Sequence, residues 1–456
     1  MKSRFGESEA MEHAGLSQQE FNAIVARHQQ FLRRQPGGLR ANLKMRDLSH
    51  FDLSGLDLSS ADFSGARLFS AHLASTNLIG AILYGCDARL ANLHRADLSR
   101  ADLRGACLRG AVLSDAQLVE ADIRDGTLVH YSKGGEITQI NFEAKRLIAE
   151  LTCANIQGAN LSRAKISNAF IVQTDLRDAV MRGAKFVGAN LTNSDLTGSD
   201  LQNADLSEAN MTGVKLNGAI MSGATLSRTR LVNASLIGTI LDEKHWRLPE
   251  VAAAIHAQTL QEANVDLTQC LTLHRVWIDA DGKQGARADL TALNLSGQDL
   301  QGVNLSAALL TGCTLRGIRL GGARLAMADL ALADLRRADL RRTDLRGVNL
   351  ERATLIDADL TRANLSPVLI QNTNFSLWRS NLRRARLNNV NFQGADLRKV
   401  HFARANLTRA NLRDANLRDA DFTDADLTNA DLTGADIAGA DFSGAELSGT
   451  GGLAAT

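Results

Sequence analysis

From Ala41 onward, a large apolar residue recurs at every fifth position of the chain. The series begins with Leu43, Leu48 and Leu53 and runs unbroken to Leu128. A small residue, usually Ala, stands two positions before each of them, Asp or Asn stands immediately before it, and Ser, Thr, Arg or Gly follow it. A period of five differs from the 3.6 of an amphipathic helix and from the 2 of an alternating strand. The pattern therefore predicts neither long helices nor long strands.

Each five has an inward and an outward side. The small residue and the Leu are two positions apart, so both point to the same side of a short extended segment, and the Asp or Asn between them points to the other side. The last two residues of the five are of types that favour turns. Repetition predicts short straight segments separated by turns, with a Leu ladder and an Ala ladder inside. Stacked coils of this kind would satisfy each other's backbone groups.

These residues carry a family resemblance. The tandem A(D/N)LXX motif resembles that of the pentapeptide-repeat proteins, and it covers most of the chain. The resemblance implies an all-β solenoid, a right-handed quadrilateral β-helix of pentapeptide repeats with four fives per coil. The four-sided coil comes from the resemblance, because the period alone does not give it.

Breaks in the repeat suggest the domain organisation. The unbroken runs of central residues are Leu43 to Leu128, Leu151 to Leu241, Leu290 to Phe375 and Leu382 to Leu447. We therefore expect an N-terminal tail and helical cap at 1–40, and a first β-helix at 41–241 with an excursion at 129–150. A helical connector and second cap would follow at 242–287, then a second β-helix at 288–448 with a break near 376–381, and a flexible tail at 449–456.

Two segments outside the repeat predict caps. Residues 16–34 read as an amphipathic helix that begins with a capping box of Ser17 and Glu20. Residues 248–264 are a second expected helix. The sequence after it, LHRVWIDADGKQGARADL, resembles ARHQQFLRRQPGGLRANL, with His274 matching His28 and Trp277 matching Phe31. These matches predict two copies of one cap-plus-coil unit, in which the histidines are structural rather than a functional pair.

Composition supports a core made of small units and excludes several classes of protein. Aromatic residues make up 4% of the chain, and there are three prolines. No apolar run is long enough to cross a membrane, and the charged start lacks the apolar stretch of a signal peptide. Five scattered cysteines without a CxxC pair argue against a disulfide framework and a zinc site. We expect a bacterial, cytoplasmic protein.

No catalytic motif is present in the sequence. It contains no phosphate-binding loop, no GxSxG elbow and no HExxH. The many Asp residues recur at repeat spacing, which is typical of turn-forming side chains. We expect no enzyme activity, no catalytic residues, no cofactor and no metal site.

Charge is distributed unevenly along the chain, although the net charge is only +1. Residues 316–409 contain 18 Lys and Arg against 8 Asp and Glu, whereas residues 411–446 are acidic. With twenty residues per coil, Arg362 should stack beside Arg342. The candidate partner surface consists of Arg336, Arg337, Arg341, Arg342, Arg346, Arg362, Arg383 and Arg384. The alternative is that these arginines pair with flanking aspartates on an ordinary polar surface.

The favoured function is a non-enzymatic scaffold of two rods that binds a protein whose identity the sequence does not reveal. A basic side that binds nucleic acid is possible but not favoured, because aromatic residues are not interleaved with the arginines. The resemblance also implies a second alternative, DNA mimicry. Some members of the family bind DNA gyrase, a topoisomerase, by imitating the shape and charge of duplex DNA. A mimic should be strongly anionic, and this chain is not. The sequence leaves open the oligomeric state and whether the rods stack or hinge at 242–287.

Overall fold

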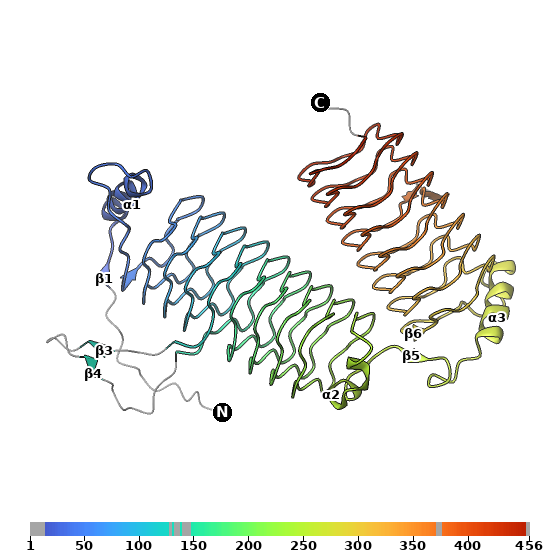
Figure 1. Cartoon of the computed structure of the whole chain (residues 1–456), viewed down its shortest axis with the longest axis horizontal. Coiled ribbons are helices and arrows are strands. Elements are labelled where there is room, and N and C mark those ends of the chain that lie inside the picture. Colours follow the sequence, from blue (N-terminus) through green and yellow to red (C-terminus); the bar gives the residue numbers. More distant parts are fainter. Residues whose placement is uncertain (1–13, 127–129, 132–136, 139–146, 371–375, 453–456) are drawn as a thin grey trace. The chain divides into compact units, whose positions relative to one another are not determined.

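The chain winds in coils of twenty residues. The structure is a computed structural model that describes residues 14–126, 130–131, 137–138, 147–370 and 376–452 (Figure 1). Isolated parallel bridges join residues twenty apart, as in the series Asn42, Asp62, Ile82 and Asp102. Successive bridges along the chain are five residues apart and are separated by two-residue turns. The strands are only two or three residues long, and the described residues form no closed sheet.

Backbone hydrogen bonds connect each coil to the next. The N–H of the central Leu43 donates to the carbonyl of Asp62 at 2.7 Å, and the N–H of Asp62 donates back to the carbonyl of Ala41 at 3.0 Å. The same forward and backward donation recurs in later coils, for example at Leu103, which donates to Asp122 at 2.8 Å. The coils therefore satisfy each other's backbone groups, as neighbouring strands do.

The interior contains the two ladders that the period of five predicts. Leu103 is 0% exposed and Ala101 is 1% exposed, and most other Leu and Ala positions of the coils are buried in the same way, whereas those of the last coil, such as Ala435 and Leu447, are partly buried. Cys86 and Cys313 replace Ala at the small position and are also buried. Near the end of the chain the interior admits a stack of rings, with centroids 4.9 Å apart for Phe402 and Phe422. The predicted inward assignment is confirmed.

Each turn is closed by the Asp or Asn side chain that precedes the central residue. The Oδ1 of Asp52 accepts the backbone N–H of Ser54 at 3.0 Å, and the Oδ1 of Asn210 accepts that of Thr212 at 3.2 Å. The second turn residue has a positive φ whether it is Gly322, at 68°, or Arg342, at 56°. The short side chain of Asp or Asn thus stabilises a turn that otherwise favours glycine.

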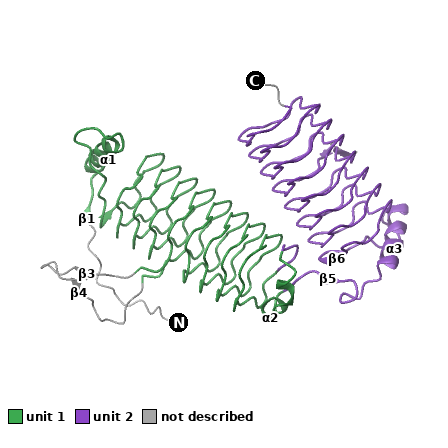
Figure 2. Cartoon of the chain, viewed as in Figure 1, with its two compact units in different colours: residues 1–235, 241–254 green, residues 236–240, 255–456 purple. Residues whose placement is uncertain are grey.

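The chain divides into two compact units (Figure 2). The first consists of residues 1–235 and 241–254, and the second of residues 236–240 and 255–456. Unit 1 contains β1 (Ala14–Gly15), α1 (Gln18–Leu32), β2 (Arg46–Asp47), β3 (His130–Tyr131), β4 (Ile137–Thr138), η1 (His245–Arg247) and α2 (Pro249–Ala252). Unit 2 contains β5 (Gln258–Thr259), α3 (Leu267–Asp279), β6 (Leu293–Asn294), β7 (Val368–Ile370) and β8 (Ser376–Trp378).

Helix α1 covers the first coil of unit 1. Its capping box is formed, with the N–H of Glu20 donating to Ser17 Oγ at 3.2 Å and the N–H of Ser17 donating to Glu20 Oε2 at 2.9 Å. Phe21 is buried and meets Phe51 edge to face, with centroids 5.4 Å apart. Because Phe51 stands where the repeat otherwise has a small residue, the cap accommodates a ring that the coil interior would exclude. The predicted helix at 16–34 is confirmed.

The long helix of the connector lies later than expected. Residues 248–264 form only the single turn of α2 and the strand β5, whereas α3 extends over Leu267–Asp279. The prediction of one helix at 248–264 is wrong, because part of this segment pairs with the coils: Leu236 donates its N–H to the carbonyl of Ile255, and β5 pairs in parallel with β6. The need to satisfy backbone groups at the edge of a coil overrides helix propensity there.

Two excursions leave the coils. The first, within the expected excursion at 129–150, includes the antiparallel pair β3 and β4, and the rest of the interval 127–146 lies outside the described residues. The second includes the antiparallel pair β7 and β8. It begins after Leu365, earlier than the break expected near 376–381, because Pro367 has no N–H for the ladder. Ile370 therefore lies in β7 instead of the core, and Phe375 lies outside the described residues.

Candidate functional site

The candidate arginines are distributed over the four turns of the coil instead of one side. Within residues 336–352, these turns are at 336–337, 341–342, 346–347 and 351–352. Arg383 belongs with the last of them, because the N–H of Arg352 donates to its carbonyl at 3.0 Å. Only Arg341, Arg342 and Arg362 come together, since Arg342 donates its N–H to the carbonyl of Thr361 at 3.0 Å. The expected stacking of Arg342 and Arg362 is confirmed.

Three of the arginines are paired with the aspartate two residues earlier. Arg341 donates from Nε to Asp339 Oδ1 at 2.8 Å and from Nη2 to Oδ2 at 2.7 Å. Arg336 binds Asp334 and Arg346 binds Asp344 in the same bidentate way. The hydrogen bond from Arg341 lowers the pKa of Asp339. These pairs are part of the turns, and their charges are largely compensated.

The other arginines differ in their surroundings. Arg337 approaches Asp357, with 4.0 Å between its Nε and the carboxylate. Arg384 is half-buried in its turn, and Arg383 is exposed. Arg342 and Arg362 are exposed, and no carboxylate of a described residue lies within 4.0 Å of either guanidinium group. They are the second residues of their turns, where the side chain is not directed back to the Asp of its own five.

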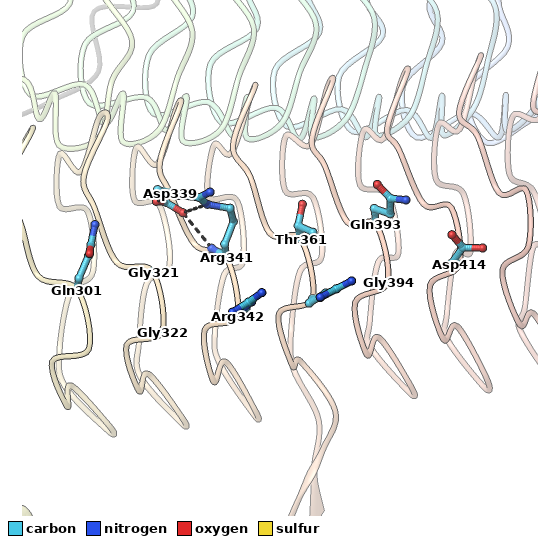
Figure 3. Close-up of a pocket in the computed structure, with 11 residues that line it drawn as sticks. Gln301, Gly321, Gly322, Asp339, Arg341, Arg342, Thr361, Gln393, Gly394 and Asp414 are labelled. Atoms are coloured by element: carbon cyan, nitrogen blue, oxygen red, sulfur yellow. Dashed lines mark hydrogen bonds and ion pairs between the residues drawn. The ribbon is translucent and has the colours of Figure 1, made fainter.

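Arg342 and Arg362 line a groove of about 840 Å³ in unit 2 (Figure 3). The groove runs along two adjacent columns of turn residues. Its lining consists of Gln301, Gly321, Gly322, Asp339, Arg341, Arg342, Thr361, Arg362, Gln393, Gly394 and Asp414. It extends from the coil of Gln301 to that of Asp414, because the chain resumes the same columns after the β7–β8 excursion.

Glycines make the hollow. Gly321 and Gly322 occupy turn positions that hold Arg341 and Arg342 in the next coil, and Gly394 follows Arg362 in the coil after the excursion. A Cβ on Gly322 would have no atom within 4 Å, and one on Gly321 would lie 3.6 Å from Asp339. Side chains at these positions would project into the groove. The groove therefore exists because these positions lack side chains, whereas the neighbouring coils carry long ones.

The electrostatic character of the groove changes along its length. Arg342 lies near its middle, beside the compensated pair of Arg341 and Asp339 (Figure 3). Arg362 lines the groove one coil further on. Asp414 lies at one end, and no cation of the described part of the chain lies within 4.0 Å of its carboxylate. Gln301 and Gln393 add polar side chains. The arrangement can bind charged and hydrogen-bonding groups, but it brings no nucleophile and general base together.

The described ranges contain no group of three or more His, Cys, Asp or Glu side chains placed to hold a metal ion. They also include no helix of the length and apolar character needed to cross a membrane.

A comparison with protein families identifies the repeat. A family model described as pentapeptide repeats matches residues 40–73, 71–110, 96–129, 174–213, 204–242, 288–325 and 328–366. A second, described as a pentapeptide repeat region, matches residues 375–451. Together they cover well over half of the chain. The chain belongs to the pentapeptide-repeat family.

Solved pentapeptide-repeat structures resemble parts of the chain. HetL from the cyanobacterium Nostoc, described as involved in the regulation of heterocyst differentiation, is 25% identical, with 73% of this chain and 94% of HetL covered and a TM-score of 0.19. QnrB1, a plasmid-mediated fluoroquinolone resistance protein, is 21% identical over 44% of this chain and 88% of its own, with a TM-score of 0.26. Rfr23 from the cyanobacterium Cyanothece is 24% identical, over 33% and 90%, with a TM-score of 0.18. None of the curated proteins compared with the chain matches it.

Sequence reasoning missed part of the groove in this pentapeptide-repeat protein. Gly321, Gly394 and Asp414 carry no motif of their own. Counting in twenties from Arg362 leads to Leu382, whereas the turn residue that follows in the structure is Gly394, because Arg362 donates its N–H to the carbonyl of Gln393 at 3.0 Å. Had the excursion at 366–379 been located in the sequence, the same count would have placed these residues beside Arg362.

Proposed function

We propose that the chain is a non-enzymatic scaffold for protein–protein interaction, and that the groove of unit 2 is the surface that binds a protein partner. The observation that carries this proposal is the pair of uncompensated guanidinium groups, Arg342 and Arg362, in a hollow of an otherwise filled coil. A rigid ladder of backbone hydrogen bonds on both sides holds the two side chains in adjacent coils. Preorganisation of this kind lowers the entropic cost of binding.

We further propose that the chain consists of two copies of one unit: the cap at 1–40 with the coils to 241, and the connector and cap at 242–287 with the coils to 448. The caps support this duplication. His28 and His274 are both 0% exposed, and their Nδ1 atoms accept the N–H of Ala41 at 3.1 Å and of Ala288 at 3.0 Å.

The surroundings of these two histidines also match. The His28 ring stacks on Phe31 at 5.8 Å and the His274 ring on Trp277 at 5.6 Å. Each cap also has a short parallel strand pair, β1 with β2 and β5 with β6. Such a detailed correspondence favours two copies of one ancestral cap over two unrelated segments.

For the coils, we infer the right-handed quadrilateral β-helix expected of the family. The support is the register of twenty residues between bridged positions and the four turns in each twenty. In this geometry the two columns of the groove flank one edge of the rod. A cytoplasmic location remains part of the proposal, and fractionation of cells that express the full chain would test it.

The experiment fills the groove. Gly321 has no positive φ, so Gly321→Trp introduces a ring without forcing a residue into the left-handed region. Ala331→Trp is the matched control, because Ala331 holds the same place in its five but lies in the turn column of Glu351. Proteins cross-linked to the wild type in a bacterial lysate are identified by mass spectrometry, then purified and assayed for direct binding. Gly321→Trp should abolish the binding that Ala331→Trp retains.

Two results would contradict the proposal. Equal binding of the purified partner by both variants would remove the groove from the interaction. Inhibition or protection of DNA gyrase supercoiling by the wild type and by Gly321→Trp alike would support the alternative of DNA mimicry, which does not need this hollow.

A further inference from the structure

We infer that the groove binds an extended acidic segment of the partner, with two carboxylates on Arg342 and Arg362 and a basic side chain, two residues beyond the second carboxylate, at Asp414. This inference rests on the proposed function and specifies the chemistry of the ligand. It follows from which charges in the groove remain uncompensated, how far apart they are and which polar groups lie between them.

The uncompensated charges of the groove determine the charge that the ligand must bring. Arg341 is compensated by Asp339, with a second carboxylate, that of Asp359, 3.8 Å from its Nε. Arg342 and Arg362 have no such partner within the described residues, although both line the same hollow. Two guanidinium groups in adjacent coils favour a ligand with two carboxylates, because arginine binds carboxylates through paired, charge-assisted hydrogen bonds.

The length of the groove determines how many residues of a peptide it can hold. From the coil of Gln301 to that of Asp414 there are five inter-coil steps, which at about 4.8 Å each give a groove of roughly 24 Å. An extended peptide advances about 3.4 Å per residue, so about seven residues fill this length. Carboxylates two residues apart on such a peptide point to the same side, and long arginine side chains on adjacent coils can reach both. The amides of Gln301 and Gln393 lie within the same length, where they can bind the peptide backbone.

The charges along the groove differ in sign, with arginines near its middle and an aspartate at one end. Asp414 lies two coils beyond Arg362, since Gly394 stands between them in the column. Two steps of about 4.8 Å correspond to between two and three residues of extended peptide, and of these only a side chain two residues on points to the same side as the carboxylates. A basic side chain at that distance from the acidic pair would meet the carboxylate of Asp414, whereas an acidic one would be repelled. The groove thus selects a charge sequence and not only a net charge.

A protein segment is favoured over nucleic acid. Strong binding of nucleic acid neutralises many phosphates, and the groove offers only two uncompensated cations. Asp339 and Asp414 also line it and would oppose a run of phosphates. None of its lining side chains is aromatic, so bases would have no surface on which to stack.

The test measures binding of fluorescent seven-residue peptides to the full-length protein by anisotropy. One peptide carries two glutamates at alternate positions and a lysine two residues from the second, and a reversed version covers the opposite chain direction. Control peptides replace the glutamates by glutamine or the lysine by glutamate. A single-stranded oligonucleotide of seven nucleotides is the nucleic-acid probe. The protein variants are Arg342→Gln/Arg362→Gln, Asp414→Asn and Arg383→Gln/Arg409→Gln.

The last variant is the matched control. Arg383 and Arg409 are exposed and lie in other turn columns, so the net charge changes equally without altering the groove. We expect Arg342→Gln/Arg362→Gln to weaken binding of one of the two acidic peptides about tenfold, and the control pair to weaken it less than about twofold. Asp414→Asn should reduce the preference for lysine over glutamate at the position of the lysine. High salt should weaken the wild-type complex.

Several results would overturn the inference. These are equal affinity for the glutamate and glutamine peptides, equal loss in the two arginine double variants, or tighter binding of the oligonucleotide than of both peptides. If the peptides fail but a purified partner still requires an open groove at Gly321, the acidic-segment inference is wrong and the scaffold proposal stands. If a peptide binds as described but Gly321→Trp does not change binding of the purified partner, the acidic-segment inference stands and the proposal that the groove binds this partner is wrong. Circular dichroism melts of each variant identify any loss caused by misfolding.

Discussion

At the scale of the residue, position within the five determines what each side chain does. Arg341 and Arg342 are neighbours in the sequence, yet the first is bound to Asp339 and the second faces the groove. The difference arises because Arg341 is the first turn residue and its backbone N–H already donates to Asp339 Oδ1 at 3.2 Å, which places the guanidinium over the same carboxylate. Chemical type alone does not identify a binding residue in a repeat protein.

The interior positions give the most direct prediction at this scale. Leu103→Ala removes a side chain that is 0% exposed, so it should leave a cavity and lower the free energy of unfolding by about 2–5 kcal/mol. Ala101→Leu should overpack the small ladder and lower it by about 1–3 kcal/mol. Urea denaturation followed by circular dichroism measures both. Wild-type midpoints for the two variants would refute the inward assignment.

The arginine–aspartate pairs give a second prediction. The side chain of Asp334 is 4% exposed beside Arg336, whereas that of Asp344 is 27% exposed beside Arg346. Asp334→Ala should therefore cost about 1.5–3 kcal/mol, because it leaves a part-buried charge without its hydrogen bonds. Asp344→Ala should cost about 1 kcal/mol or less. Chemical denaturation of the two variants, each with its Arg→Ala partner in a double-mutant cycle, measures the difference, and equal costs would contradict it.

Sequence alone predicts the interior better than the site. The burial of Leu103 and Ala101 follows from the period, since every five repeats the same choice. The pairing of Arg336, Arg341 and Arg346 with aspartates could also be predicted from the sequence, because each of these arginines stands two residues after an Asp. The groove could not be predicted in the same way, because it depends on the absence of side chains at Gly321 and Gly322 and on the position of Asp414. The position of Asp414 in the coil depends on the length of the β7–β8 excursion, and this length does not follow from the period of five.

At the scale of the element, the caps show where local pattern is sufficient and where it fails. Helix α1 begins at its predicted capping box, since Ser17 and Glu20 satisfy each other locally. The helix expected at 248–264 is displaced to α3, because Ile255 and β5 pair with coil edges that only the folded chain contains. Capping signals are local, whereas pairing with an edge is set by residues far away in sequence.

The buried cap histidine gives a prediction about pH. Burial lowers the pKa of His28, and Arg40 also lowers it, while Asp57 and the backbone of Ser59 oppose the shift. Its Nδ1 accepts the N–H of Ala41, so a proton there would set two donors against each other. Because the unfolded chain then binds the proton more readily, stability should be complete above the unfolded pKa of about 6.5 and decrease as the pH falls below it.

His28→Ala tests this by urea denaturation at pH 7.5 and pH 5.5. At pH 7.5 it should lower the free energy of unfolding by about 1–3 kcal/mol, since the N–H of Ala41 loses its acceptor. The free energy of unfolding should differ less between the two pH values in the variant than in the wild type. Some pH dependence should persist, because burial also lowers the pKa values of His274 in the second cap and His245 in η1. Equal pH dependence in wild type and variant would show that His28 does not contribute.

At the scale of the whole molecule, a repeat protein is stabilised by neighbour-to-neighbour contacts. Each coil bonds to the ones before and after it, so stability propagates along an unbroken ladder and stops where the ladder is interrupted. The segment 242–287 replaces coils with η1, α2 and α3, and the chain divides into two compact units in this region. We therefore expect the units to unfold as separate transitions.

The three tryptophans allow this to be measured unit by unit. Trp246 belongs to unit 1, and Trp277 and Trp378 belong to unit 2. Trp277→Phe/Trp378→Phe leaves a fluorescence reporter only in the first unit, and Trp246→Phe leaves reporters only in the second. Each reporter variant is then combined with one of two buried-leucine substitutions, Leu103→Ala in unit 1 or Leu340→Ala in unit 2.

A cavity should destabilise only the unit that contains it. Leu103→Ala should lower the urea midpoint reported by Trp246 and leave that reported by Trp277 and Trp378 in place, and Leu340→Ala should do the opposite, because both leucines are buried at equivalent positions of their fives. If either substitution shifts both midpoints together, the units are coupled and the connector transmits stability across 242–287. Separate shifts would mean that the groove of unit 2 retains its geometry when unit 1 is unfolded, so that peptide binding should persist between the two transitions.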